Sequence, residues 1–342
     1  MTIAIRPADL KSDRQLIIDL LSRFLTPFSD DRRFSWLYEK NPAGIAKAWL
    51  AHSEGTIGMA CAFPRRVCIA GRRELSWVLG DFCVDDKFRS LGPALQLQRI
   101  CLAVAETEHV PVCYDFPSAS MLAVYKRLGL NVNGEMLRLA KPLRVDRKVK
   151  ELVKSPLAQR MMSCVGNALI KGTLSKPKAD GTLQISIHQS SCDDEFTVLA
   201  QEQRGTLGFC LERSAEYLNW RYINNPLARH EIVTARRNGR LVGYIVWTQM
   251  EDDVFIVDLF CEQDAAIVRR LVAEIVFLAQ ERDAISVSVW IAKSHPWKSL
   301  FAEIGFRPRE TAPIMIIPSK SFAHKIDRKP MGYYFMQGDR DS

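Results

Sequence analysis

A chain of 342 residues exceeds what one hydrophobic core usually supports, so two domains are expected. A hydrophobic fraction of 47% and a charged fraction of 25% are those of an ordinary globular protein, which excludes a disordered or fibrous class. The net charge of +8 favours an anionic partner: a nucleotide-like cofactor, a phosphorylated substrate, a membrane surface or a nucleic acid.

The cysteines and the N-terminal residues indicate the compartment. Nine scattered cysteines show neither a CxxC pair nor the spacing of metal ligands, which is typical of reduced core residues and predicts no metal site. The first ten residues, MTIAIRPADL, contain no basic segment followed by an apolar run, and no apolar run approaches the length of a membrane span. We therefore expect a cytoplasmic protein.

The first part of the chain alternates strands and helices. Strand patterns are expected at 2–6, 48–52, 57–64, 67–70, 74–84 and 110–116, and helical patterns at 9–25, 94–108 and 118–128. Gly71 marks a hairpin turn. Gly80 lies inside the longest strand, where a glycine indicates a bulge or a close approach of the backbone.

The second part of the chain repeats this order. Strands are expected at 231–235, 241–247, 254–260 and 284–291, and helices at 264–280 and 296–304. The spacing of Trp220, Tyr222 and the pair Asn225-Pro226 also matches that of Trp36, Tyr38 and Asn41-Pro42. We interpret this as an internal duplication of a unit of about 140 residues. Features present in both copies are expected to serve the fold, and features present in one copy are candidates for function.

Residues 81–96, DFCVDDKFRSLGPALQ, are predicted to form a strand end, a charged turn and the start of a helix. Gly92 allows a close approach of the backbone to a ligand, and Pro93 fits the first helical turn. The unpaired N–H groups of such a loop and the helix N-terminus behind it form an anion site suited to phosphate. The corresponding residues 260–266 contain no glycine, and Glu262 and Asp264 would repel a pyrophosphate.

The spacing Arg89-x-x-Gly92-x-Ala94 resembles the pyrophosphate-binding loop of the GNAT superfamily of acyl-CoA-dependent N-acyltransferases. The order of elements is similar to the GNAT fold, and its repetition resembles tandem, two-domain bacterial chains. The resemblance implies an α/β class (an α+β mixed sheet), with two GNAT-like domains, each a twisted, mostly antiparallel sheet flanked by helices. Residues 1–142 would carry the acyl-CoA loop, 143–180 would form a basic amphipathic connector and linker, and 181–342 would form a second, degenerate domain.

The resemblance also implies an activity. An N-acyltransferase would move an acetyl or other short acyl group from acyl-CoA to an amine of a small molecule, such as an amino sugar or a cell-surface precursor, by direct attack on the thioester. Acetyl-CoA or another acyl-CoA would be the co-substrate, and no nucleic acid partner is expected. Two alternatives stay open: a Fem-like transferase that depends on aminoacyl-tRNA, which an intact pyrophosphate loop does not favour, and a non-catalytic acyl-CoA-binding or scaffold module.

Site residues follow from the same resemblance. Tyr125 matches the tyrosine that acts as general acid toward the CoA thiolate, or it packs in the core; the second copy has Phe301 there. The general base is sought among Asp81 and Asp115, with Asp85 and Glu74 as further options. A backbone N–H near residues 82–84 would bind the oxyanion. The predicted cofactor contacts are Phe82, Cys83, Val84, Arg89, Ser90, Leu91, Gly92, Pro93, Ala94 and Ser118. Ser118 is also a candidate N-cap.

Residues 143–171 differ in kind from the rest of the chain. Basic residues from Arg144 to Lys171 are interspersed with apolar residues from Leu152 to Leu169, which predicts one or two basic amphipathic helices interrupted at Pro156. Two interpretations are open. The segment is either a connector that packs on both domains or a surface that docks peripherally on anionic lipid.

Overall fold

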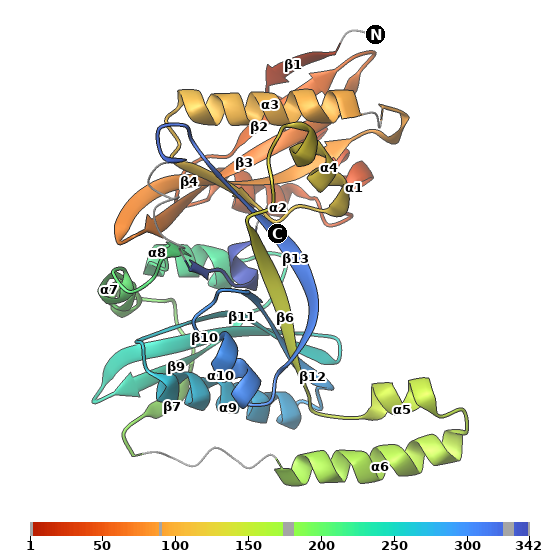
Figure 1. Ribbon diagram of the computed structural model, residues 1–342, viewed down its shortest axis with the longest axis vertical. Helices are drawn as coiled ribbons and strands as arrows, with labels where there is room; N and C mark the ends of the chain where they lie inside the picture. The colour runs from red at the N-terminus through yellow and green to blue at the C-terminus, as the bar shows by residue number, and fades with distance from the viewer. Residues whose placement is uncertain (1–2, 89–90, 174–180, 324–331, 341–342) are drawn as a thin grey trace.

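The computed structural model describes residues 3–88, 91–173, 181–323 and 332–340. Its strands form one 14-stranded mixed sheet, with helices packed on it (Figure 1). The main path of the sheet is β1-β2-β3-β4-β5-β13-β6-β12-β11-β10-β9-β7. The mixed α/β class predicted from the sequence is therefore confirmed, but the strands of the two halves are continuous where separate sheets were expected.

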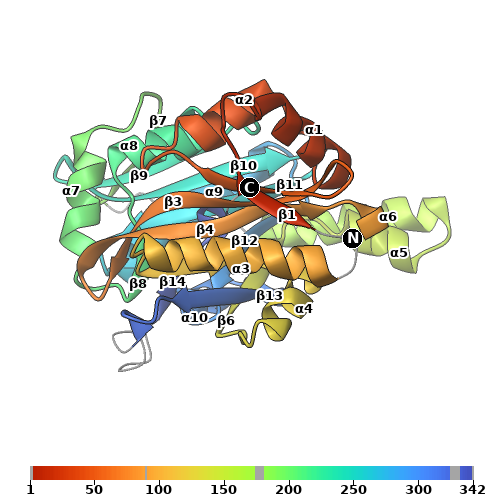
Figure 2. The same ribbon diagram turned by 90° about the horizontal axis from the view of Figure 1, so that it is seen from above.

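The first half ends with β6. In chain order its elements are β1 (Ala4–Pro7), α1 (Arg14–Phe24), α2 (Asp31–Phe34), the π-helix η1 (Ser35–Glu39), β2 (Lys47–His52), β3 (Thr56–Ile69), β4 (Arg72–Val84), the 3₁₀-helix η2 (Asp86–Phe88), α3 (Leu91–Thr107), β5 (Val112–Asp115), α4 (Ala119–Arg127) and β6 (Gly134–Pro142). Helix α3 covers one face of this part of the sheet (Figure 2), because Leu97, Cys101 and Ala105 recur on one helical face and are buried there.

The second half begins after a helical hairpin, α5 (Asp146–Leu152) and α6 (Pro156–Thr173). Its elements are β7 (Gln184–His188), α7 (Asp194–Gln203), β8 (Phe209–Leu211), α8 (Ala215–Leu218), the π-helix η3 (Asn219–Ile223), β9 (Glu231–Arg237), β10 (Arg240–Met250), β11 (Asp253–Cys261), α9 (Ala265–Glu281), β12 (Ser286–Ala292), α10 (Lys298–Glu303), β13 (Arg307–Pro318), β14 (Tyr333–Tyr334) and the 3₁₀-helix η4 (Gln337–Asp339). From η3 to β13 this order matches that from η1 to β6, except that η2 has no counterpart.

The last long strand of each half crosses to the other half. β6 pairs along its length with β12, from Met136 opposite Ala292 to Pro142 opposite Ser286. β13 pairs with β5 at its carboxyl end, where Met315 lies opposite Asp115, and with β6. These two long strands join the upper and lower parts of the molecule in Figure 1.

A pair of tryptophans marks the centre between the halves. The Nε1 of Trp36 donates to the carbonyl oxygen of Trp220 at 2.8 Å, and the Nε1 of Trp220 donates to that of Trp36 at 2.8 Å. The two rings stack with centroids 5.1 Å apart. Each tryptophan lies on a π-helix at the same place in its half. This reciprocal contact confirms the structural role predicted for the repeated segment.

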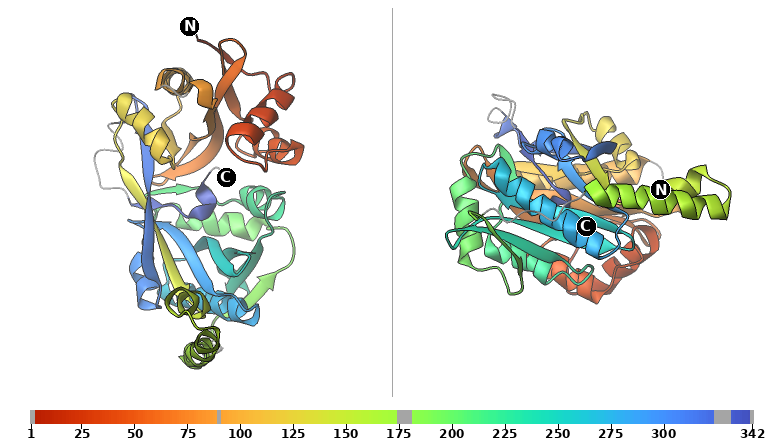
Figure 3. Two further views of the ribbon diagram at one scale, coloured as in Figure 1. Left: turned by 90° about the vertical axis from the view of Figure 1, so that its right-hand side faces the viewer. Right: turned by 90° about the horizontal axis from the view of Figure 1, so that it is seen from below.

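The hairpin α5–α6 extends away from the rest of the chain (Figures 1 and 3). α5 is attached to the second half through an ion pair of 2.9 Å between Arg147 and Asp253, and its Val149 is buried. α6 packs on α5, and no residue of α6 whose exposure the structure describes is buried. The segment is therefore not packed between both halves. In the described chain no helix combines the length and the apolar character needed to cross a membrane.

Candidate active site

A bulge interrupts β4 next to Gly80, as predicted. Two residues of β4, Asp81 and Phe82, lie opposite the single Ala60 of β3. The φ angle of Asp81 is 43°, in the left-handed region that residues other than glycine rarely adopt. A bulge takes one residue out of the ladder and re-aims the strand beyond it. The backbone beyond Asp81, where the oxyanion donor is sought, therefore leaves the regular register of the sheet.

β4 and β5 pair only near the start of their shared edge. The parallel pairs are Trp77 with Cys113 and Val78 with Tyr114. β4 then continues to Val84, and within the described residues no further pair joins the two strands. The carboxyl ends of two neighbouring parallel strands thus diverge, and in open α/β sheets this is where ligands bind.

The predicted phosphate loop follows β4. The side chain of Asp85 accepts a hydrogen bond from the backbone N–H of Lys87 at 2.9 Å, so this carboxylate caps the turn. Arg89 and Ser90 lie outside the described residues. Leu91 begins α3, and Gly92 and Pro93 lie in its first turn. The N-terminus of this helix of 17 residues carries the partial positive charge that favours an anion, so the pyrophosphate contact stays a prediction with a suitable location.

Four of the predicted residues converge beside the diverging strands. Tyr125 of α4 and Ala94 of α3 belong to one buried apolar cluster, and Phe82 and Val84 of β4 pack against it. Met315 of β13 also belongs to this cluster and was not predicted. The second half therefore contributes a side chain to this region, which the order of elements alone could not indicate.

Tyr125 and Asp115 are joined directly. The hydroxyl of Tyr125, a residue that is 1% exposed, donates to Oδ2 of Asp115 at 2.5 Å. Burial, and secondly the Asp115 carboxylate, raise the pKa of Tyr125 well above its usual value near 10. The phenol therefore keeps its proton at neutral pH. A proton donor and a carboxylate acceptor lie within one hydrogen bond of each other at the carboxyl end of β5.

Asp81 lies in a buried ion pair rather than in the open. Its carboxylate accepts two hydrogen bonds from the Arg33 guanidinium, at 2.7 and 2.6 Å, and one from the Tyr38 hydroxyl at 2.6 Å. Burial is the first cause that raises the pKa of Tyr38 well above its usual value, and the Asp81 charge is the second. All carboxylate oxygens are occupied by donors, so this geometry does not favour Asp81 as a general base.

The second half repeats this arrangement. Asp258 lies three residues before Cys261, the last residue of β11, and Asp81 lies three residues before Val84, the last residue of β4. Cys261 and Val84 each pair with a glycine of the neighbouring strand, Gly243 and Gly58 respectively. Asp258 is fully buried and pairs with Arg213 at 3.1 Å. A buried aspartate with an arginine partner in both halves is a feature of the fold. In the sequence this signal is the aspartate that begins both Asp-Phe-Cys-Val at 81–84 and Asp-Leu-Phe-Cys at 258–261.

Two further predicted contacts can be placed. The Cys83 side chain faces the large core, where burial raises the pKa of its thiol to about 12, so only its backbone is suited to a ligand. The Ser118 hydroxyl accepts a hydrogen bond from the backbone N–H of Met121 at 3.3 Å, which confirms it as the N-cap of α4. Its contact with the cofactor stays a prediction.

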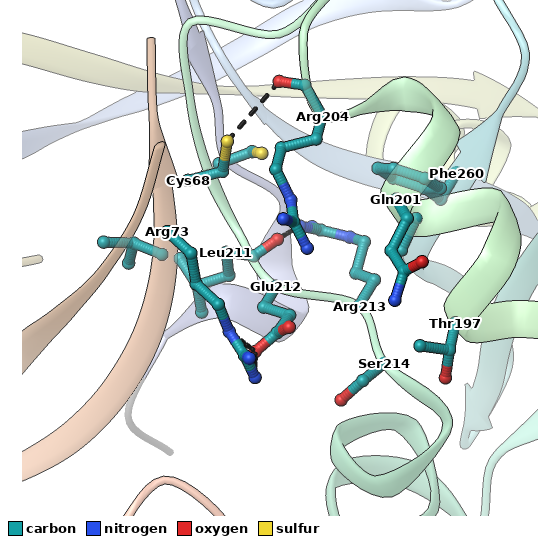
Figure 4. A pocket seen from close by; sticks show the side chains of 13 residues that line it. Cys68, Arg73, Thr197, Gln201, Arg204, Leu211, Glu212, Arg213, Ser214 and Phe260 are labelled. Atoms are coloured by element: carbon teal, nitrogen blue, oxygen red, sulfur yellow. Dashed lines mark hydrogen bonds and ion pairs between the residues drawn. The ribbon is translucent and has the colours of Figure 1, made fainter. Parts of the chain in front are cut away.

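A pocket between the halves lies elsewhere. It is formed by the β3–β4 hairpin of the first half and by α7 and β8 of the second (Figure 4). Its polar lining includes Arg73, Gln201, Arg204 and Glu212, and Arg73 is ion-paired with Glu212 at 2.9 Å. None of the predicted site residues lines it. This pocket and the Tyr125–Asp115 pair are therefore separate features.

The fold is that of GNAT-type acyltransferases, as predicted. No protein-family model and no curated protein sequence matches the chain. Among solved structures, a conserved protein from Enterococcus faecalis V583, described as a probable N-acyltransferase, has a TM-score of 0.68 at 14% identity, covering 94% of this chain and 74% of that one. A GCN5-related N-acetyltransferase from Anabaena variabilis has a TM-score of 0.66 at 16% identity, covering 92% and 72%.

A third structure carries an acyl-CoA. The N-myristoyltransferase of Saccharomyces cerevisiae with bound myristoyl-CoA has a TM-score of 0.58 at 11% identity, covering 92% of this chain and 82% of that one. At such identities the likeness shows a shared fold. The matches span more than nine-tenths of this chain, so the likeness includes parts of both halves.

Proposed function

We propose that this chain is an N-acyltransferase that moves an acetyl or other short acyl group from acyl-CoA to an amine of a small molecule. The observation that carries the proposal is the convergence of Phe82, Val84, Ala94 and Tyr125 beside the diverging ends of β4 and β5. The shared fold with acyltransferases supports it. We further infer that the two halves arose by duplication and that only the first retains the phosphate loop.

The residues present fit an acyl-CoA. The N-terminus of α3 with Gly92 suits the pyrophosphate, and the bulged backbone at residues 82–84 suits the thioester oxygen, where a backbone N–H would stabilise negative charge as it develops. The acyl-CoA supplies an activated acyl group. The new bond joins the amine nitrogen to the acyl carbon, the carbon–sulfur bond breaks, and the amine proton must reach the leaving sulfur.

Tyr125 and Asp115 provide a route for that proton. A phenol whose pKa is raised above 10 is a weaker acid than a thiol of pKa about 8.5, so Tyr125 cannot remain deprotonated after giving up its proton. The Asp115 carboxylate can take the amine proton through a water. It can then reprotonate the Tyr125 oxygen along their hydrogen bond. Asp115 thus acts as base and Tyr125 as acid, while Asp81 holds the bulge in place.

Calorimetric titration tests the proposal. Acetyl-CoA is titrated into the wild-type protein, into Gly92→Glu, which places a carboxylate in the first turn of α3, and into Ala266→Glu, the same change in the first turn of α9. Binding by the wild type and by Ala266→Glu, but not by Gly92→Glu, is expected. Equal affinity in all three would refute the location of the pyrophosphate, and no binding by any would refute the acyl-CoA co-substrate.

A further inference from the structure

The hairpin α5–α6 presents an apolar face that nothing in the described chain covers. Six large apolar side chains of the hairpin are exposed by 53–79%: Leu152, Leu157, Met161, Met162, Val165 and Leu169. In α6 the residues 157, 161, 165 and 169 are four apart and therefore line one side of the helix. A face of this kind on a soluble surface marks a site of interaction.

The side of α6 opposite to this face is occupied by α5. The Asn167 side chain accepts from the backbone N–H of Val145 at 2.8 Å and donates to Asp146 at 2.9 Å. A Cβ on Gly166 would lie 2.5 Å from a methyl group of Val145, so the two helices approach closely there. The apolar face is thus held outward by specific contacts on the other side of the helix.

The charge around this face is positive. Residues 143–173 contain seven Lys or Arg and two Asp or Glu, and α6 itself contains no acidic residue. Four exposed cations, Lys148, Lys150, Lys154 and Arg160, have no ion-pair partner among the described residues. Anionic lipid headgroups complement this charge, whereas a second copy of the chain would bring the same charge to the contact.

We propose that the hairpin α5–α6 docks on an anionic membrane surface, with α6 lying in the plane of the interface. Leu157, Met161 and Val165 enter the boundary between headgroups and acyl chains, and the lysines contact the headgroups. The helix has 18 residues and is about 27 Å long. Docking leaves the GNAT-fold halves outside the bilayer, and it does not depend on the acyl-transfer reaction.

Flotation of the full chain with vesicles tests this proposal. Vesicles made of equal parts phosphatidylserine and phosphatidylcholine should carry the wild type, and vesicles of phosphatidylcholine alone should carry at least about tenfold less. The variant Leu157→Ser/Met161→Ser/Val165→Ser should lose at least about tenfold of the binding. Its matched control, Phe28→Ser/Ile45→Ser/Met250→Ser, removes equally exposed apolar side chains elsewhere and should bind like the wild type.

The contribution of charge is tested separately. Lys148→Glu/Lys154→Glu should lower binding by about tenfold or more, whereas Lys11→Glu/Lys40→Glu, with the same change in net charge, should leave it within about twofold. Light scattering identifies the competing occupant. A wild-type dimer that the serine variant converts to a monomer, or a wild type that stays with the soluble fraction, would overturn the proposal.

Discussion

Replacing Asp81 by Asn separates a structural role of this carboxylate from a catalytic one. The side chains of Asp81 and Arg33 are 2% and 3% exposed, and three donors surround the carboxylate. Asn keeps the size but removes the charge, so the buried Arg33 guanidinium loses its ion pair with Asp81. Breaking a buried pair from one side costs about 3–5 kcal/mol. For a chain of 342 residues, this loss corresponds to a fall of the unfolding temperature by roughly 4–7 °C.

The second half provides the matched control. Asp258→Asn leaves Arg213 with one carboxylate partner fewer in the corresponding place, in the half that contains none of the predicted catalytic residues. Both variants should lose thermal stability, measured by circular dichroism. Turnover of Asp81→Asn, measured well below its unfolding temperature, should fall by less than about tenfold, because a residue that only positions the bulge takes no proton.

Two results would refute this reasoning. An unchanged unfolding temperature with a loss of turnover of about 10²–10⁴ would assign Asp81 the role of general base. The double variant Arg33→Met/Asp81→Asn tests the ion pair itself, since removing both charges should recover part of the stability lost by Asp81→Asn. A double variant less stable than Asp81→Asn alone would show that Arg33 stabilises the fold by another interaction.

Further predictions concern the phenol, a buried histidine and the strand exchange. Tyr125→Phe should lower kcat by about 10²-fold or more with calorimetric affinity for acetyl-CoA within about twofold, and Asp115→Asn should lower kcat by at least as much; an unchanged kcat would remove Tyr125 from the reaction. Burial lowers the pKa of His295 to about 3 from 6.5, so the folded state binds fewer protons below pH 6.5 and stability falls as the pH drops from there. By pH 5 this loss of the free energy of unfolding should reach about 2 kcal/mol. In urea unfolding of His295→Asn, the loss of stability on acidification should be smaller by that amount. A fragment of residues 181–342 should show no cooperative transition on heating, because β12 loses β6, and co-expression with residues 1–180 should restore it.

The sequence indicated much of the candidate site because its signals are local. Gly80 indicated the bulge, Ser118 the start of α4, and Gly92 with Pro93 the first turn of α3. Each depends on the conformation of a few neighbouring residues, which residue type alone constrains. The Tyr125–Asp115 hydrogen bond depends on a longer separation in sequence. It requires the end of β5 to meet a residue of α4 that lies ten positions further along the chain.

The parts that sequence could not supply depend on long-range pairing. Arg33 meets Asp81 across 48 positions of the chain, and Met315 reaches Asp115 across 200. The periodicity of a strand shows which face is buried but not which strand lies beside it. The internal repeat indicates the structural role of Asp81, because a buried aspartate recurs at position 258. A feature found in both halves is evidence for a role in the fold before any contact is known.

The strand exchange gives the second half a place in the candidate active site, although its own residues 260–266 carry Glu262 and Asp264. β13 lies beside β5, with Met315 directly opposite Asp115, and Met315 packs in the same cluster as Tyr125. One side of the candidate active site therefore belongs to the half that has no phosphate loop. Loss of that half would expose the edge of β5 and remove a buried neighbour of the phenol, which would lower the pKa of Tyr125 because burial is the largest cause of its shift. Under the proposed function, the second half would act on the reaction through the environment of Tyr125.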